Sequence, residues 1–93
     1  VAGIGKRDVA FDAGLPIPER AYRDGQAISV SGAVTTAVMD QHAFIEVDAS
    51  SKLDVGDVIA FSTSHPCLTF DKWRAIAVCD DEFNVTHWVN TRF

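Results

Sequence analysis

The 93-residue sequence has little positive charge, few cysteines and no long apolar run, and each shortage argues against a class of protein. Eight Lys and Arg stand against thirteen Asp and Glu, and the net charge of −5 opposes binding to nucleic acid, whose phosphates need a basic surface. The basic residues are scattered, which argues against an amphipathic membrane-binding stretch. No apolar run approaches the roughly 20 residues of a membrane span. We therefore expect neither nucleic acid nor membrane as a partner.

Cysteine and lysine are also scarce. The chain has two cysteines, Cys67 and Cys79, whereas a small secreted scaffold usually carries more. A single disulfide between them stays open, but a reduced, metal-related Cys67 explains its neighbours better. No signal peptide is visible, and we expect a cytoplasmic protein. The sequence lacks a phosphate-binding glycine loop, and none of its few lysines has the apolar surroundings that suit a Schiff base.

Apolar residues make up 47% of the chain, which at this length indicates one globular domain. The pattern predicts an all-β (mainly β) fold, a small antiparallel barrel or sandwich of five to seven short strands. Strands are expected at 8–12, 34–39, 43–47, 58–61, 73–79 and 83–88, with 58–61 buried on both faces. The proline-rich residues 13–27 are expected to form a long loop. A polar loop with one helical turn near 68–72 should join 61 to 73.

His65 and Cys67 stand two residues apart, with Pro66 between them. Proline favours an extended conformation at the residue before it, and side chains two apart in an extended segment point to one side. An imidazole and a thiolate can then share one ion, and zinc accepts both donors. A structural zinc site needs four protein ligands, and the sequence does not offer four at suitable spacing. Two protein ligands would leave coordination positions open for substrate or water. A hydrogen-bonded loop histidine beside a half-buried cysteine is the other interpretation.

The other candidate residues are less strongly indicated as functional. Asp71 can ligate a metal, support the metal site by orienting His65, or cap a helical turn. Capping, or a salt bridge with Lys72 or Arg74, is the commonest role for such a residue. Asp12 is expected to fix its loop through an Asx-type turn. Structural or exposed positions are expected for the others, Tyr22, His42, Trp73 and His87.

Two separated stretches resemble a known family. They are R-D-V-A-F-D-A-G-L-P at 7–16 and V-G-D-V-I at 55–59, the latter followed by S-H-P-C-L-T-F-D-K-W-R at 64–74. Both are similar to the C-terminal domain of the D-serine dehydratase and D-threonine aldolase family. The similarity extends over a variable acidic hairpin and a closing strand, and so covers most of the chain. The string at 64–74 is far more specific than the His65–Cys67 pair alone.

The resemblance implies a function that composition does not show. Family members join an N-terminal (β/α)-barrel, which holds pyridoxal 5′-phosphate on a lysine, to a C-terminal β domain. Residues 1–93 are then expected to be a fragment without the barrel and without catalytic residues of its own. His65 and Cys67 map onto the family's ligands for zinc or another divalent metal. The whole protein is expected to be a homodimeric lyase acting on a small D-amino acid, as a dehydratase, deaminase or aldolase, or else a racemase.

Two alternatives stay open. A non-catalytic β module for dimerisation or partner binding would use His65 and Cys67 only as loop structure. A stand-alone thiol enzyme would use Cys67 as its nucleophile, although no oxyanion-forming glycine-rich turn accompanies it.

Overall fold

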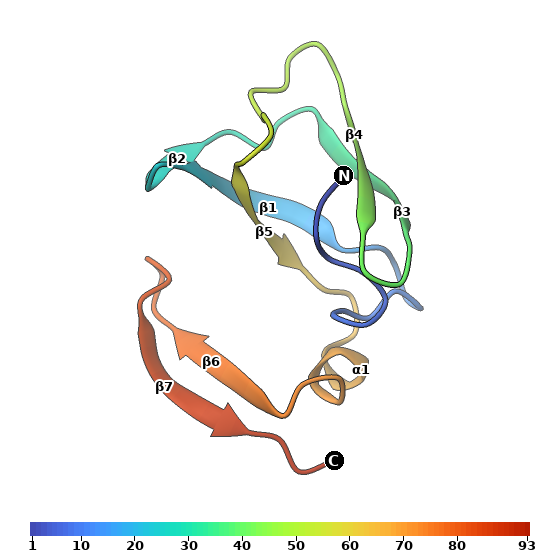
Figure 1. Ribbon diagram of the computed structural model, residues 1–93, viewed down its shortest axis with the longest axis vertical. Helices are drawn as coiled ribbons and strands as arrows, with labels where there is room; N and C mark the ends of the chain where they lie inside the picture. The colour runs from blue at the N-terminus through green and yellow to red at the C-terminus, as the bar shows by residue number, and fades with distance from the viewer.

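The computed structural model describes every residue from Val1 to Phe93 and is mainly β, as the sequence predicts. Seven short strands form three antiparallel sheets, and one short helix lies between the fifth and sixth strands (Figure 1). The elements are β1 (Ile17–Arg23), β2 (Gln26–Ile28), β3 (Ala33–Val38), β4 (Ala43–Val47), β5 (Val58–Ser62), α1 (Pro66–Phe70), β6 (Ala75–Cys79) and β7 (Val85–Asn90). The three sheets do not close into a barrel. No helix is long and apolar enough to cross a membrane.

The first sheet has the order β2-β1-β5, so β1 is its central strand. The loop predicted over 13–27 is therefore wrong from Ile17 onward. Proline is tolerated here because β2 pairs only with the last three residues of β1, which leaves the start of β1 with one neighbour. The pairing with β5 also shifts register between Pro18 and Arg20, and a bulge or an open edge is where a missing N–H does least harm.

The N-terminal segment lies along the β3–β4 hairpin, which forms as predicted. Ala2 pairs with Ala43 in an isolated bridge. Residues 8–12, predicted as a strand, instead form an irregular segment with turns at its two ends. The Asp8 carboxylate accepts the Gly5 N–H at 2.9 Å and folds the chain back. Gly5 is required by space, since a Cβ there would lie 2.5 Å from backbone atoms of the β3–β4 turn.

The β6–β7 hairpin pairs with no other strand and forms a separate layer (Figure 1). Its tip contacts β1, where Arg20 donates to the Asp81 carbonyl at 2.7 Å. The Phe83 ring stands edge-on to Tyr22, with 5.8 Å between the ring centroids. β7 begins two residues later than predicted, because the turn at the acidic residues runs to 84.

An ion pair ties the end of β1 to the turn before β5. Arg23 contacts both carboxylate oxygens of Asp57, at 2.7 and 2.8 Å, and also donates to the Lys52 carbonyl at 2.9 Å. The Asp54 N–H donates to the same carboxylate at 2.7 Å. The guanidinium of Arg23 and this N–H lower the pKa of Asp57. The sheet thus gains a polar anchor at one end.

The buried core is small. It consists mainly of Val9, Ala10, Pro16, Ala21, Val38 and Ala43. The accessible surface of 6540 Å² exceeds the about 5,300 Å² that an average folded monomer of 10.1 kDa exposes. Part of the excess is apolar: β5, predicted to be buried on both faces, has Val58 66% exposed, and Trp88 on β7 is 64% exposed. The domain therefore carries a sizeable uncovered apolar surface.

Candidate metal centre

His65 and Cys67 lie where the chain leaves β5 and enters α1. His65 directly precedes the helix with an extended backbone (φ −140°, ψ 90°), as the following proline favours. Pro66 takes the first helical position, where a fixed φ and a missing N–H are both tolerated. Cys67 is therefore already helical, so our prediction of an extended segment through both residues was wrong beyond His65. The helix also begins two residues before the predicted turn.

The thiols of Cys67 and Cys79 are both free, and both residues are exposed. No disulfide joins them, so the thiol of Cys67 is available as a ligand. Asp71 ends α1, where its backbone N–H bonds the Cys67 and Thr69 carbonyls. Asp71 thus occupies the C-terminal cap position through its backbone, and its side chain forms no ion pair with Lys72 or Arg74.

The ring of His65 contacts a carboxylate from the opposite end of the chain. Its Nδ1 lies 3.0 Å from Oδ2 and 3.2 Å from Oδ1 of Asp12. Both side chains are partly exposed, so water competes for this ion pair. The hydrogen bond from His65 is the main cause of the lowered pKa of Asp12. Nε2 of His65 makes no hydrogen bond within the chain.

Residues 8–14 and 64–73 lie side by side and are joined by a series of hydrogen bonds in antiparallel order. Besides Asp12 with His65, the bonded pairs are Asp8 with Trp73, Ala10 with Thr69, and Gly14 with Ser64, at 2.8, 2.9 and 3.0 Å. These are the two stretches that carry the family resemblance. The two sequence patterns therefore form one hydrogen-bonded unit in the structure.

Thr69 is the central connection between these segments. Its Oγ1 donates to the His65 carbonyl at 3.0 Å and accepts the Ala10 N–H at 2.9 Å. The Thr63 hydroxyl, 2.8 Å away, then donates to the same oxygen. One donor and two acceptor sites are all that a hydroxyl has, so Thr69 is fully bonded. It holds the start of α1 against both the N-terminal segment and the end of β5.

His65 and Cys67 have side chains of the types that bind divalent metals. No group of three or more His, Cys, Asp or Glu side chains in this chain is placed to hold a metal ion. A structural zinc site needs four protein ligands, so this chain cannot form one alone. The imidazole of His65 and the thiol of Cys67 are donors that zinc accepts, and other ligands would come from outside the chain.

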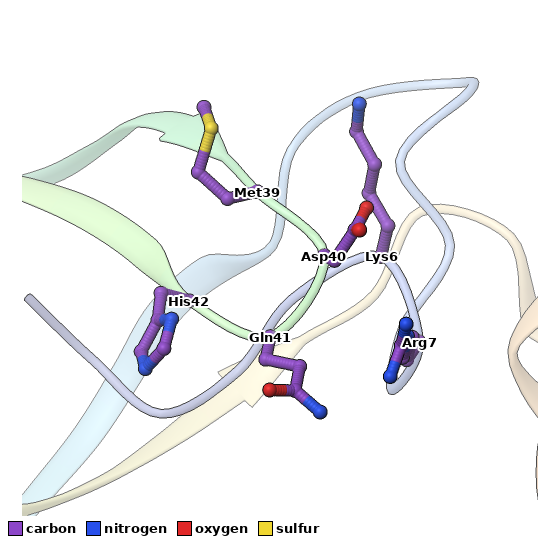
Figure 2. A pocket seen from close by; sticks show the side chains of 6 residues that line it. All are labelled: Lys6, Arg7, Met39, Asp40, Gln41 and His42. Atoms are coloured by element: carbon purple, nitrogen blue, oxygen red, sulfur yellow. The ribbon is translucent and has the colours of Figure 1, made fainter.

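The other histidines and Tyr22 lie away from this centre. His87 Nδ1 is 3.1 Å from the Thr86 hydroxyl, and Tyr22 packs against Phe83. His42 lines a polar hollow of about 400 Å³ together with Lys6, Arg7, Met39, Asp40 and Gln41. Figure 2 shows that these side chains point in different directions and do not converge on one point. We assign the hollow no role.

The sequence model of a family described as "Putative serine dehydratase domain" matches residues 1–79. The chain belongs to this family. The predicted resemblance is thereby confirmed, and the matched part contains both hydrogen-bonded segments and the residues of the candidate centre. The match to the serine dehydratase domain ends with β6, so it does not cover the acidic turn and closing strand to which we extended the resemblance. No curated protein matches the chain.

Sequence reasoning missed Asp12 as the partner of His65. The two residues are 53 positions apart, and Asp12 precedes an Ala-Gly pair that suggests a turn. One signal was available: the stretches 7–16 and 64–74 both belong to the serine dehydratase domain pattern. Contact between two separated motifs of one small domain is a reasonable inference, but it does not reveal which side chains meet.

Proposed function

We propose that this chain is the metal-bearing C-terminal β domain of a pyridoxal-phosphate-dependent lyase that acts on small D-amino acids, as a dehydratase, deaminase or aldolase. One observation carries the proposal. Within the family match, the His65 ring is engaged by a carboxylate through Nδ1, and the free thiol of Cys67 lies two residues away. Metal-binding histidines commonly have such a partner on the second ring nitrogen.

In this proposal His65 and Cys67 hold zinc or another divalent metal. When bound in the whole protein, pyridoxal 5′-phosphate supplies an electron sink and the metal supplies a Lewis acid for the substrate's β-hydroxyl. Residues of this chain keep the two ligands in place: Thr69 fixes the His65 backbone, and Trp73 anchors the end of the segment on Asp8. The reduced thiol that ligation requires fits a cytoplasmic location.

The uncovered apolar surface supports a missing domain as the partner. An open groove of about 320 Å³ lies between α1 and the β6–β7 hairpin, and it is lined by Thr69, Phe70, Trp73, Ala75, Ile76, Ala77 and Trp88. Apolar surface of this kind is usually covered by another domain or subunit. We propose that the N-terminal barrel of the same protein, or the second subunit of a homodimer, covers it. The cofactor lysine would then belong to the barrel.

Turnover of D-serine and D-threonine by the protein that includes the barrel tests this function. His65→Ala and Cys67→Ala should each lower kcat/KM by about 100-fold or more, since a Lewis acid contributes several kcal/mol to such a transition state. Chelation should give the same loss, and added zinc or manganese should restore activity. Cys79→Ala and His87→Ala serve as matched controls. Unchanged turnover after thorough chelation, with a stable dimer formed through this domain, would instead favour a non-catalytic β module.

A further inference from the structure

The two ring nitrogens of His65 are in different surroundings. Nδ1 faces the Asp12 carboxylate at 3.0 and 3.2 Å, whereas Nε2 has no partner in the chain. An ionised carboxylate can only accept hydrogen bonds, so Nδ1 must carry the hydrogen. A neutral ring protonated at Nδ1 has its lone pair on Nε2. The geometry therefore selects one of the two tautomers.

Asp12 is itself held in place from both sides. On one side, the Ala10 N–H is bonded to Thr69 Oγ1, and on the other the Gly14 carbonyl accepts from the Ser64 hydroxyl. Gly14 has φ +136°, a conformation that glycine adopts without strain. These bonds join the loop around Asp12 to the residues that flank His65, so the backbone holds the carboxylate and the ring close to each other.

We propose that Asp12 is a positioning residue, which holds His65 in the Nδ1–H tautomer and so presents Nε2 to a divalent metal. This inference rests on the proposed function, in which His65 and Cys67 are the ligands. Asp12 is the only carboxylate in contact with the ring. It does not touch the metal in this proposal, and its effect passes through the imidazole.

The tautomer of His65 can be measured without any metal. Long-range nitrogen–proton NMR correlations of the protein, with nitrogen-15 in its three histidines and at about pH 8, where an ordinary imidazole is neutral, show which ring nitrogen is protonated. We expect Nδ1–H alone in the unaltered protein and a mixture of tautomers in Asp12→Ala. Asp12→Asn keeps an accepting oxygen and should remain closer to the unaltered protein. Asp40→Ala removes an exposed carboxylate elsewhere and should change nothing.

Zinc titration of the same variants gives the second measurement. Asp12→Ala should weaken zinc binding about 10- to 100-fold, with Asp12→Asn in between and Asp40→Ala unchanged. A His65 spectrum that is the same in Asp12→Ala and in the unaltered protein would overturn the inference. So would unchanged zinc affinity in Asp12→Ala while His65→Ala abolishes binding, and in both cases the proposed function would stand. Zinc affinity that does not depend on His65 would overturn the proposed function and this inference with it.

Discussion

Among single residues, Thr69 does the most to keep the candidate centre together. Its hydroxyl joins the His65 carbonyl, the Ala10 N–H and the Thr63 hydroxyl. Thr69→Val keeps the shape of the side chain but leaves the Ala10 N–H, on a fully buried residue, without a partner. We expect a loss of about 1–3 kcal/mol in the free energy of unfolding, measured in urea.

Thr36→Val is the matched control, because the Thr36 hydroxyl makes one exposed bond of 3.3 Å to the Phe44 carbonyl. It should cost less than about 0.5 kcal/mol. Equal losses in the two variants would show that Thr69 has no special role. A valine at 69 should also weaken the Asp12–His65 contact, because Ala10 and His65 are the groups it releases.

At the scale of secondary structure, the sequence pattern correctly predicted the elements whose formation depends on neighbouring residues. The β-branched run at 34–38 and the run at 43–47 formed the expected hairpin. β1 was missed because two prolines suggested a loop. They are tolerated because β2 pairs only with the end of β1 and because the pairing with β5 shifts register next to Pro18. The His65–Cys67 pair was visible in sequence, whereas its support by Asp12 depends on contacts between distant segments.

The β6–β7 hairpin is held at its tip by few contacts, chiefly the Phe83 ring against Tyr22. Phe83→Ala removes an aromatic pair worth about 1 kcal/mol. Amide hydrogen exchange in β6 and β7 should become roughly fivefold faster, while β3 and β4 keep their rates. Phe93→Ala, which alters an exposed ring at the C-terminus, should leave both regions unchanged. Faster exchange throughout the molecule would contradict a hairpin that opens independently.

At the scale of the whole molecule, the structure predicts loss of stability in acid. The pKa values of Asp12, Asp48, Asp57 and Asp80 are all lowered by hydrogen bonds in the folded chain. The unfolded chain therefore binds protons more readily, so these carboxylates contribute their stability above about pH 4–5 and lose it as the pH falls through the folded-state values.

Asp57→Asn isolates one of these contributions. The variant loses the bidentate pair with Arg23, so it should be less stable than the unaltered protein at pH 7. The difference should shrink as the pH falls below about 4, because the unfolded chain begins to bind a proton at Asp57 there. It should vanish only below the lowered pKa that Asp57 has in the folded chain. Urea unfolding at pH 7 and pH 3 measures both differences. A difference that is the same at the two pH values would show that the pair does not act through the charge of Asp57.

The whole molecule has a family match and an uncovered apolar surface, and we propose that His65 and Cys67 bind a metal in it. Titration with cobalt(II), in place of zinc, tests its central claim most directly, since thiolate ligation gives a charge-transfer absorption band. We predict one cobalt ion per chain with this band, which Cys67→Ser and His65→Ala remove and Cys79→Ser and His87→Ala preserve. A band that survives Cys67→Ser, or that disappears with Cys79→Ser, would contradict the assignment of His65 and Cys67 as the metal ligands.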